Sequence, residues 1–588
     1  MNAKILAMLL AAGAAAAPAS AQPQQTAQAQ TDSAALHAIE SAVQQALLET
    51  EFTAQFRAGK RITHFADYSL APVREQAAQQ ARWKDALAKI DPARLSEDER
   101  RSYGILQFEL SGIARDEAEY WLTFDLTSYQ SPMAIGTAHQ IMAAHALATP
   151  ADAAEYIRLV EAYATMLGTL GAKLEAQTAR GIYMPKAALP VARKTLTSLA
   201  DAAAALRPAD ARLSGLDAAT RGKLLAAVDA TLDGKIRPAY ARLGALVGAD
   251  YEAKAPEAVG IGQYPGGKTV YQKLIHRYTT MEMTPEQLHQ QGLAAVADVS
   301  ARMQAIRTQL GFTGTSRAFY DKISTDPRFL AKTPADVEAT YDRYIKAIEP
   351  KVADYFRVVP KAPYGAKRLP AASEAGQTFG YYSPPTPAEP RGIYYYNGSN
   401  LEKRSLINAG TLIYHELVPG HHFQIALQQE NKALSPFRQN YYAGAFNEGW
   451  GEYAASLGIP LGLYDTPEAL YGRYVNEMFL TIRLVVDTGM NHFGWSLEKA
   501  RAYMREVSSL SDMEIDSESL RYSTSIPGQA LSYRTGYDKM WSLRRHAEER
   551  LGAAFDVRDF HDVVLLPGTR PMPVLEADIN AYIASKRP

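Results

Sequence analysis

The chain has 588 residues, of which 47% are hydrophobic and 21% are charged, so it is long enough for an extensive core divided between two or more lobes. Its formal net charge of −1, without a long run of like charge, argues against nucleic acid as a partner. The absence of cysteine excludes disulfides, thiolate metal ligands, a cysteine nucleophile and a cysteine-linked lipid, so any metal must be held by histidine and carboxylate side chains.

The N-terminal segment has the features of an export signal. Residues 1–21 carry one charge, Lys4, then an apolar run and the small-x-small sequence Ala19-Ser20-Ala21. The run is shorter than the ~20 apolar residues of a membrane crossing, so we expect cleavage and no membrane contact afterwards. The mature protein is then periplasmic or secreted. Residues 22–33 lack hydrophobic periodicity, which predicts a disordered leader.

Residues 34–357 are predicted to form a mainly helical lobe. Stretches such as Thr149–Ala176 and Ala218–Val247 place apolar residues three and four positions apart. Thr284-Pro285-Glu286-Gln287 combines an N-cap threonine, a proline at the first helical position and a glutamine at the third, which predicts a helix over 284–309.

The remaining chain is divided by its prolines. Residues 358–392 are predicted to be a long surface connection because they contain Pro360, Pro363, Pro370, Pro384, Pro385, Pro387 and Pro390. Residues 393–588 form the predicted metal-site region. The β-branched and aromatic segment Gly392–Asn397 predicts an isolated edge strand, and the pattern from Ala409 onward is helical.

A cluster of histidines marks the candidate metal site. Three of the twelve histidines lie in Tyr414-His415-Glu416-Leu417-Val418-Pro419-Gly420-His421-His422. His415 and Glu416 match the first half of the His-Glu-x-x-His motif, in which the histidine binds zinc and the glutamate takes a proton from water. In that motif the second histidine follows one turn later, whereas here the histidines lie six and seven residues on, roughly 9 and 10.5 Å along a regular helix.

Pro419 and Gly420 indicate how the longer spacing is accommodated. Proline opens the helical turn and glycine tolerates unusual backbone angles, so two residues can bulge out. This distortion favours His421 as the second ligand. A regular helical projection favours His422, which remains the alternative ligand or a neighbouring contact.

Two glutamates complete the site. Glu448 and Glu452 are four residues apart and share one face of a predicted helix. Glu448 is the candidate third ligand, and Glu452 is placed to accept a hydrogen bond from a ligand histidine. Three protein ligands leave a fourth position for water, which is typical of catalytic zinc. We expect one Zn²⁺ per chain, although Mn²⁺, Co²⁺ and Ni²⁺ also suit two histidines and a glutamate.

These residues resemble the bacterial family known as domain of unknown function 885 (DUF885), which carries a His-Glu-x-x-Pro-Gly-His signature and looks like a family of zinc peptidases. The resemblance is strongest from about residue 260 and includes Gly262–Tyr271, Thr279–Leu288, Asn447–Tyr453, Arg521-Tyr522, Pro527–Tyr533 and Phe555–Gly568. A more distant similarity to angiotensin-converting-enzyme-like and oligopeptidase-type gluzincins implies a mainly α fold. Its expected form is a two-lobed helical shell around a channel, with a short edge strand or small sheet beside the metal site.

The resemblance also implies roles for single residues. His415, His421 and Glu448 are the implied ligands and Glu416 the general base, while Tyr522 or Tyr533 donates a hydrogen bond to the oxyanion. Candidates for substrate binding are Tyr395, Tyr396 and Asn397, whose strand edge can pair with an extended peptide, together with Arg521 and His561.

The predicted function is that of a secreted or periplasmic zinc metallopeptidase acting on short or unfolded peptides. Two alternatives remain open: a zinc-dependent amidohydrolase or esterase acting on a non-peptide compound, and a non-catalytic periplasmic binding protein.

Overall fold

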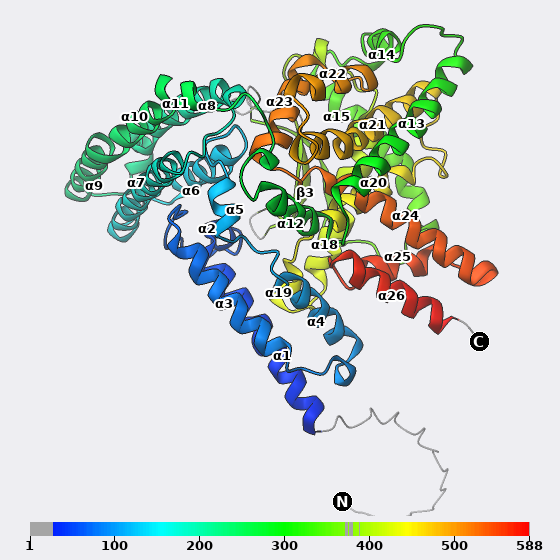
Figure 1. Ribbon diagram of the computed structural model, residues 1–588, viewed down its shortest axis with the longest axis horizontal. Coiled ribbons are helices and arrows are strands. Elements are labelled where there is room, and N and C mark those ends of the chain that lie inside the picture. Colours follow the sequence, from blue (N-terminus) through cyan, green and yellow to red (C-terminus); the bar gives the residue numbers. More distant parts are fainter. Residues whose placement is uncertain (1–26, 371–373, 375–379, 387–388, 587–588) are drawn as a thin grey trace, which may run out of the picture.

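The computed structural model describes residues 27–370, 374, 380–386 and 389–586, and the predicted export signal lies outside them. The described chain is mainly helical, with one small sheet (Figure 1). Helix α1 (Ala27–Thr50) covers residues 27–33, so the prediction of a disordered leader is wrong for them. Tertiary contacts hold this first part of the helix, because Asp32 is buried and lies 3.4 Å from Arg94 Nη1.

A first hydrophobic core lies among helices drawn from residues 52–288. Helices α6 to α11 gather at one end of the molecule (Figure 1). The expected helices in Thr149–Ala176 and Ala218–Val247 are confirmed as α7 and as the pair α9 and α10. The elements of this group are α2 (Phe52–Arg57), α5 (Glu117–Leu122), α6 (Thr137–Ala144), α7 (Pro150–Ala179), α8 (Leu189–Ala202), α9 (Ala218–Thr231), α10 (Arg237–Leu246), α11 (Ala249–Lys254) and α12 (Gly267–Thr279).

A second core joins the two ends of the chain. Arg101 on α4 donates a hydrogen bond to Asp578 on α26 at 2.9 Å, and N-terminal helices lie beside C-terminal ones (Figure 1). This core therefore crosses the predicted boundary between residues 34–357 and 393–588. Its elements are α1, α3 (Ala71–Leu87), α4 (Glu97–Glu109), α15 (Pro334–Ile348), α17 (Ala409–Glu416), α18 (His421–Glu430), α19 (Pro436–Gln439), α20 (Gly444–Ser456), α24 (Leu531–Leu551), α25 (Val557–Leu565) and α26 (Met572–Ser585).

A third core surrounds the long helix α21. The expected helix at 284–309 is confirmed as α13, and Thr284 and Gln287 form its capping box. Gly292 brings α13 close to α21, since a Cβ at this position would lie 2.7 Å from Leu484 Cβ. The elements are α13 (Pro285–Gln309), α14 (Ser316–Ser324), α21 (Pro467–Asn491), α22 (Leu497–Val507) and α23 (Asp512–Leu520).

The sheet has three strands in the order β1-β3-β2. Strand β3 (Gly392–Tyr396) pairs in parallel with β1 (Tyr364–Arg368) and antiparallel with β2 (Tyr381–Ser383). The expectation of an isolated edge strand is therefore wrong, because β3 is the central strand. The predicted surface connection 358–392 is wrong in part, because it contains β1 and β2. Its prolines within the described residues fall outside these strands, where no ladder hydrogen bond is lost.

None of the helices in the described part of the chain combines the length and the apolar character that a membrane crossing needs.

Candidate metal centre

The backbone between the two histidines leaves the helical path completely. Helix α17 ends at Glu416 and α18 begins at His421, so the expected bulge is a break between two helices. Gly420 is required there, because a Cβ would lie 1.8 Å from the carbonyl oxygen of His415. The indole Nε1 of Trp450 donates to the Pro419 carbonyl at 3.0 Å and links the break to α20.

The break brings His415, His421 and Glu448 together. One ligand atom from each lies within 4.8 Å of the other two. The Nε2 atoms of His415 and His421 are 3.7 and 3.5 Å from Oε2 of Glu448. The two imidazole rings are almost perpendicular, with centroids 4.7 Å apart. Such convergence of three donors is the geometry that a metal ion requires.

Two glycines of α20 allow this close approach. A Cβ at Gly451 would lie 2.9 Å from Nε2 of His415, so the imidazole occupies the space of the missing side chain. A Cβ at Gly449 would lie 2.4 Å from the carbonyl carbon of Gly536, which lets α24 support α20 from the other side. The sequence around Glu448 therefore serves packing as well as ligation.

The His422 side chain points away from the candidate ligands and toward the sheet. Its Nδ1 lies 3.0 Å from the Tyr382 hydroxyl and its Nε2 lies 2.9 Å from the carbonyl oxygen of Ala362. Burial lowers the pKa of His422 to about 4, so the ring is neutral near pH 7. Of the two candidate histidines, the structure places His421 beside His415 and leaves His422 against the sheet.

Glu416, the predicted general base, lies beside the candidate ligands and contacts the sheet. It follows His415 directly, and its carboxylate accepts a hydrogen bond from the backbone N–H of Tyr382 on β2. Burial, assisted by the charge of Glu448, raises the pKa of Glu416 against the opposing effect of His415 and His421. A carboxylate with a raised pKa is a better proton acceptor near neutral pH than an ordinary one.

The charge balance of the site favours a cation. Burial alone would lower the pKa of His415, but hydrogen bonds to Glu448 and Glu452 and the charge of Glu416 outweigh it and raise the pKa to about 10. A bound divalent cation would supply the positive charge that these carboxylates favour and would leave His415 neutral, as a metal ligand must be. Two imidazoles and a carboxylate are the donor set of many catalytic zinc sites. The residues therefore fit zinc.

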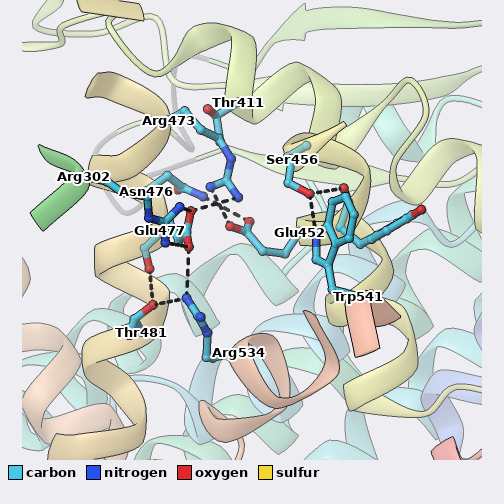
Figure 2. A network of polar contacts seen from close by, with 12 residues as sticks. Arg302, Thr411, Glu452, Ser456, Arg473, Asn476, Glu477, Thr481, Arg534 and Trp541 are labelled. Carbon is cyan, nitrogen blue, oxygen red and sulfur yellow. Dashed lines mark hydrogen bonds and ion pairs between the residues drawn. The ribbon is translucent and has the colours of Figure 1, made fainter. Parts of the chain in front are cut away.

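A buried ion-pair network holds the second glutamate of α20 (Figure 2). Oε2 of Glu452 lies 3.5 Å from Nδ1 of His415, on the ring side opposite the metal-facing nitrogen. Oε1 of Glu452 lies 2.7 Å from Nη1 of Arg473, which is fully buried on α21. Burial raises the pKa of Glu452, but Arg473 and His415 outweigh it and lower the pKa to about 2. Glu452 is therefore charged and fixes the orientation of His415.

The network continues beyond Arg473 to a second buried carboxylate, Glu477 (Figure 2). Glu477 Oε2 lies 3.6 Å from Nη2 of Arg473. Its Oε1 lies 2.8 Å from Arg302 and 3.1 Å from Arg534. Three helices, α13, α21 and α24, are thus tied to the residue that orients a metal ligand. Glu452 was predicted from the sequence, whereas these partners were not, because they are distant from it in the chain.

A tyrosine that was not predicted from the sequence contacts the candidate third ligand. The Tyr442 hydroxyl donates to Oε1 of Glu448 at 3.2 Å, and it interacts electrostatically with Tyr533. Of the two tyrosines proposed for the oxyanion, Tyr533 follows Ser532, which packs against the start of α20: a Cβ at Gly444 would lie 3.2 Å from Ser532 Cβ. Tyr522 is fully buried, donates to Glu518 and accepts a hydrogen bond from Nε of Arg483 at 2.9 Å, so its hydroxyl is already engaged.

The predicted substrate residues on β3 are mostly structural. Both edges of β3 are paired, so the expectation that it offers a free edge to a peptide is wrong. The Tyr396 hydroxyl donates to the Pro334 carbonyl at 2.9 Å, and the Asn397 amide donates to the Glu374 carbonyl at 2.7 Å. Tyr395 lies on the other face of the strand, where it packs against Tyr381.

The last two predicted residues also have structural partners. His561 is buried between the Tyr453 hydroxyl and the Tyr355 carbonyl, and burial lowers its pKa to about 3. Arg521 donates to Gln529 at 2.6 Å and lies 3.4 Å from Glu518. The structure does not bring His561 into contact with the metal-ligand residues.

The comparison with known proteins agrees with this architecture. Residues 52–579 match the model of a family described as bacterial protein of unknown function (DUF885). The chain belongs to the DUF885 family. No curated protein matches this DUF885 protein.

Two solved structures are similar to the DUF885 protein. One is a candidate lipoprotein from Colwellia psychrerythraea, with 26% identity, a TM-score of 0.81, and coverage of 95% of this chain and 99% of that one. The other is a candidate lipoprotein of unknown function from Shewanella oneidensis, with 20% identity, a TM-score of 0.69, and coverage of 92% and 99%. At 20% identity, the similarity to the Shewanella oneidensis protein shows a shared fold and nothing about function. A cysteine-linked lipid has no attachment point in the present sequence, which contains no cysteine.

Proposed function

We propose that this DUF885 protein is a periplasmic or secreted zinc metallopeptidase that hydrolyses short or unfolded peptides. The observation that carries the proposal is the convergence of His415, His421 and Glu448 within 4.8 Å, next to the half-buried Glu416. Three ligands leave a coordination position open, which favours a catalytic site over a structural one. The predicted export signal supports the location.

Each residue of the site has a separate role in the proposed hydrolysis. When bound, zinc supplies a Lewis acid that polarises a carbonyl group and makes water more acidic. Glu416 accepts the proton of the attacking water and returns it to the leaving amine. Glu452 holds His415 in one orientation, and the hydroxyl of Tyr533 donates a hydrogen bond to the oxygen that develops negative charge.

The test measures metal content and cleavage separately. Metal is determined by mass spectrometry on the mature protein and on Glu448→Ala and Glu416→Gln, and cleavage is followed on a mixed short-peptide library and an ester panel. We expect one zinc in the wild type, loss of zinc in Glu448→Ala, and retained zinc without cleavage in Glu416→Gln. Glu498→Gln, an exposed carboxylate on α22, is the matched control and retains both properties.

Two results would contradict the proposal. If Glu448→Ala retains the full zinc content and no peptide is cleaved, both the proposed ligand set and the proposed peptidase activity are refuted. Cleavage of esters or non-peptide amides in place of peptides would identify a zinc amidohydrolase or esterase, which uses the same groups.

A further inference from the structure

A buried cluster near the candidate metal centre carries more positive than negative charge. Arg483 on α21 and Arg521 after α23 share one carboxylate, that of Glu518. Nη2 of Arg483 and Nη1 of Arg521 both lie 3.4 Å from Oε2 of Glu518. Two guanidinium groups therefore face a single full negative charge.

One nitrogen of this cluster has no acceptor. Arg483 donates from Nε to the Tyr522 hydroxyl at 2.9 Å and from Nη2 to Glu518, whereas its Nη1 is buried without a hydrogen-bond partner within the described residues. A buried charged donor without an acceptor is costly, and truly unpaired ones are rare. The guanidinium thus has one buried donor that lacks an acceptor.

The neighbouring groups do not remove the excess charge. The other carboxyl group that acts on Arg521 is Asp487, which accepts hydrogen bonds from Tyr271 at 2.6 Å and from the backbone N–H of Gly528 at 3.1 Å. Burial outweighs these bonds and raises the pKa of Asp487 to about 7, so it is only partly charged at neutral pH. Tyrosine hydroxyls also act on Arg483 and Arg521, and these are neutral near pH 7.

The cluster is connected to the metal ligands through aromatic side chains. The guanidinium of Arg483 lies 4.5 Å from the ring centroid of Tyr533 and 4.1 Å from that of Phe479. Both rings are partly exposed, whereas the Arg483 side chain is 4% exposed. Ser532, the neighbour of Tyr533, packs against the first residue of α20, since a Cβ at Gly444 would lie 3.2 Å from Ser532 Cβ. Tyr442, just before this helix, donates a hydrogen bond to the candidate ligand Glu448.

We propose that Arg483, supported by Arg521, binds the C-terminal carboxylate of the peptide substrate, so that cleavage occurs near the C-terminus of the peptide. This inference rests on the proposed peptidase function. A carboxylate suits the site because its two oxygens match the planar donors of a guanidinium. The same excess charge repels the ammonium group of a peptide N-terminus, which gives the bound peptide a direction.

The experiment compares one peptide in three forms: with free termini, with an amidated C-terminus and with an acetylated N-terminus. Amidation should lower kcat/KM of the wild type about 10- to 100-fold, as expected for loss of a charge-assisted hydrogen bond in a buried site. Acetylation should leave kcat/KM within about threefold, because no N-terminal contact is lost. Binding of the free acid and the amide to the zinc-loaded Glu416→Gln protein is measured by calorimetry.

Variants then assign the preference to Arg483. Arg483→Met should abolish the ratio between acid and amide, and Arg483→Lys should retain part of it, because the charge remains without the planar donors. The ratio compares two ligands on one protein, so partial misfolding of a variant does not change it. Arg501→Lys is the matched control, since Arg501 also contacts α23, through Asp516 at 3.2 Å and Ser519 at 3.0 Å.

The outcomes separate the inference from the peptidase proposal. Equal cleavage and equal binding of the acid and the amide would overturn the carboxylate site while the peptidase function stands. Preferential binding of the acid that depends on Arg483, without cleavage of any peptide, would keep the carboxylate site and overturn the peptidase. Absence of both binding and cleavage would overturn both.

Discussion

Replacement of Arg473 by methionine tests whether the buried network sets the affinity of the metal centre. Arg473 and Glu452 are 0% and 1% exposed, and their charged atoms are 2.7 Å apart. Methionine keeps much of the side-chain volume but removes the cationic partner of the buried Glu452, which keeps its contacts with Asn476 and His415. Removing one partner of a buried ion pair costs about 3–5 kcal/mol of unfolding free energy.

The same substitution should weaken zinc binding. Without Arg473, the Glu452 carboxylate is free to move or to take up a proton, and His415 loses its fixed orientation. Loss of such an outer partner typically lowers metal affinity about 10- to 100-fold. The assays are denaturant unfolding of the metal-free protein and competition with a chelator of known zinc affinity.

Arg302→Met is the matched control for this prediction. Arg302 pairs with Glu477 at 2.8 Å but does not contact Glu452, and its side chain is partly exposed. We expect a loss of about 1 kcal/mol or less and unchanged zinc affinity. Arg473→Met protein that unfolds like the wild type and competes equally well for zinc would refute the assigned role of the network.

Two further predictions concern single side chains. Tyr533→Phe should lower kcat by about 100-fold or more with little change in KM, as for loss of an oxyanion donor. Tyr522→Phe should reduce the stability of the protein without this effect on kcat. Steady-state kinetics and thermal unfolding distinguish the two variants, and equal kcat values would contradict the assignment. His561 binds a proton more weakly when folded, because burial lowers its pKa to about 3, so stability is full above the unfolded pKa of about 6.5 and falls as the pH drops below it. This side chain alone should account for about 3 kcal/mol of loss between pH 7 and pH 4, and His561→Gln should flatten the pH dependence of unfolding; an unchanged slope would disprove it.

Local patterns in the sequence were enough to predict much of the helical architecture. Helix α13 follows from the capping box at Thr284 and Gln287, and α7 from apolar spacing along Thr149–Ala176, because caps and amphipathic periodicity depend on neighbouring residues only. The leader prediction failed for residues 27–33, since contacts such as Asp32 with Arg94 stabilise a helix whose first residues show no hydrophobic periodicity.

The strand pairing in the sheet could not be predicted from local sequence patterns. The segment Gly392–Asn397 has strand character, but its neighbours in the sheet come from a proline-rich stretch that reads as a surface connection. Whether a strand lies at an edge or in the centre depends on which segments meet it in space. The pairing of β3 with both β1 and β2 is a long-range outcome, and it removes the free edge expected for peptide binding.

Residue types and spacing alone made His415, Glu416 and Glu448 candidates, because few side chains other than histidine and carboxylate can hold zinc in a chain without cysteine. The choice between His421 and His422 required the folded chain, since it depends on the break at Gly420 and on the contact of Trp450 with Pro419. The contacts of Tyr442 and Arg473 could not be predicted from the sequence either. Their partners Glu448 and Glu452 lie beside them only because helices and loops distant in the chain pack together, and packing of that kind leaves no local periodic signal.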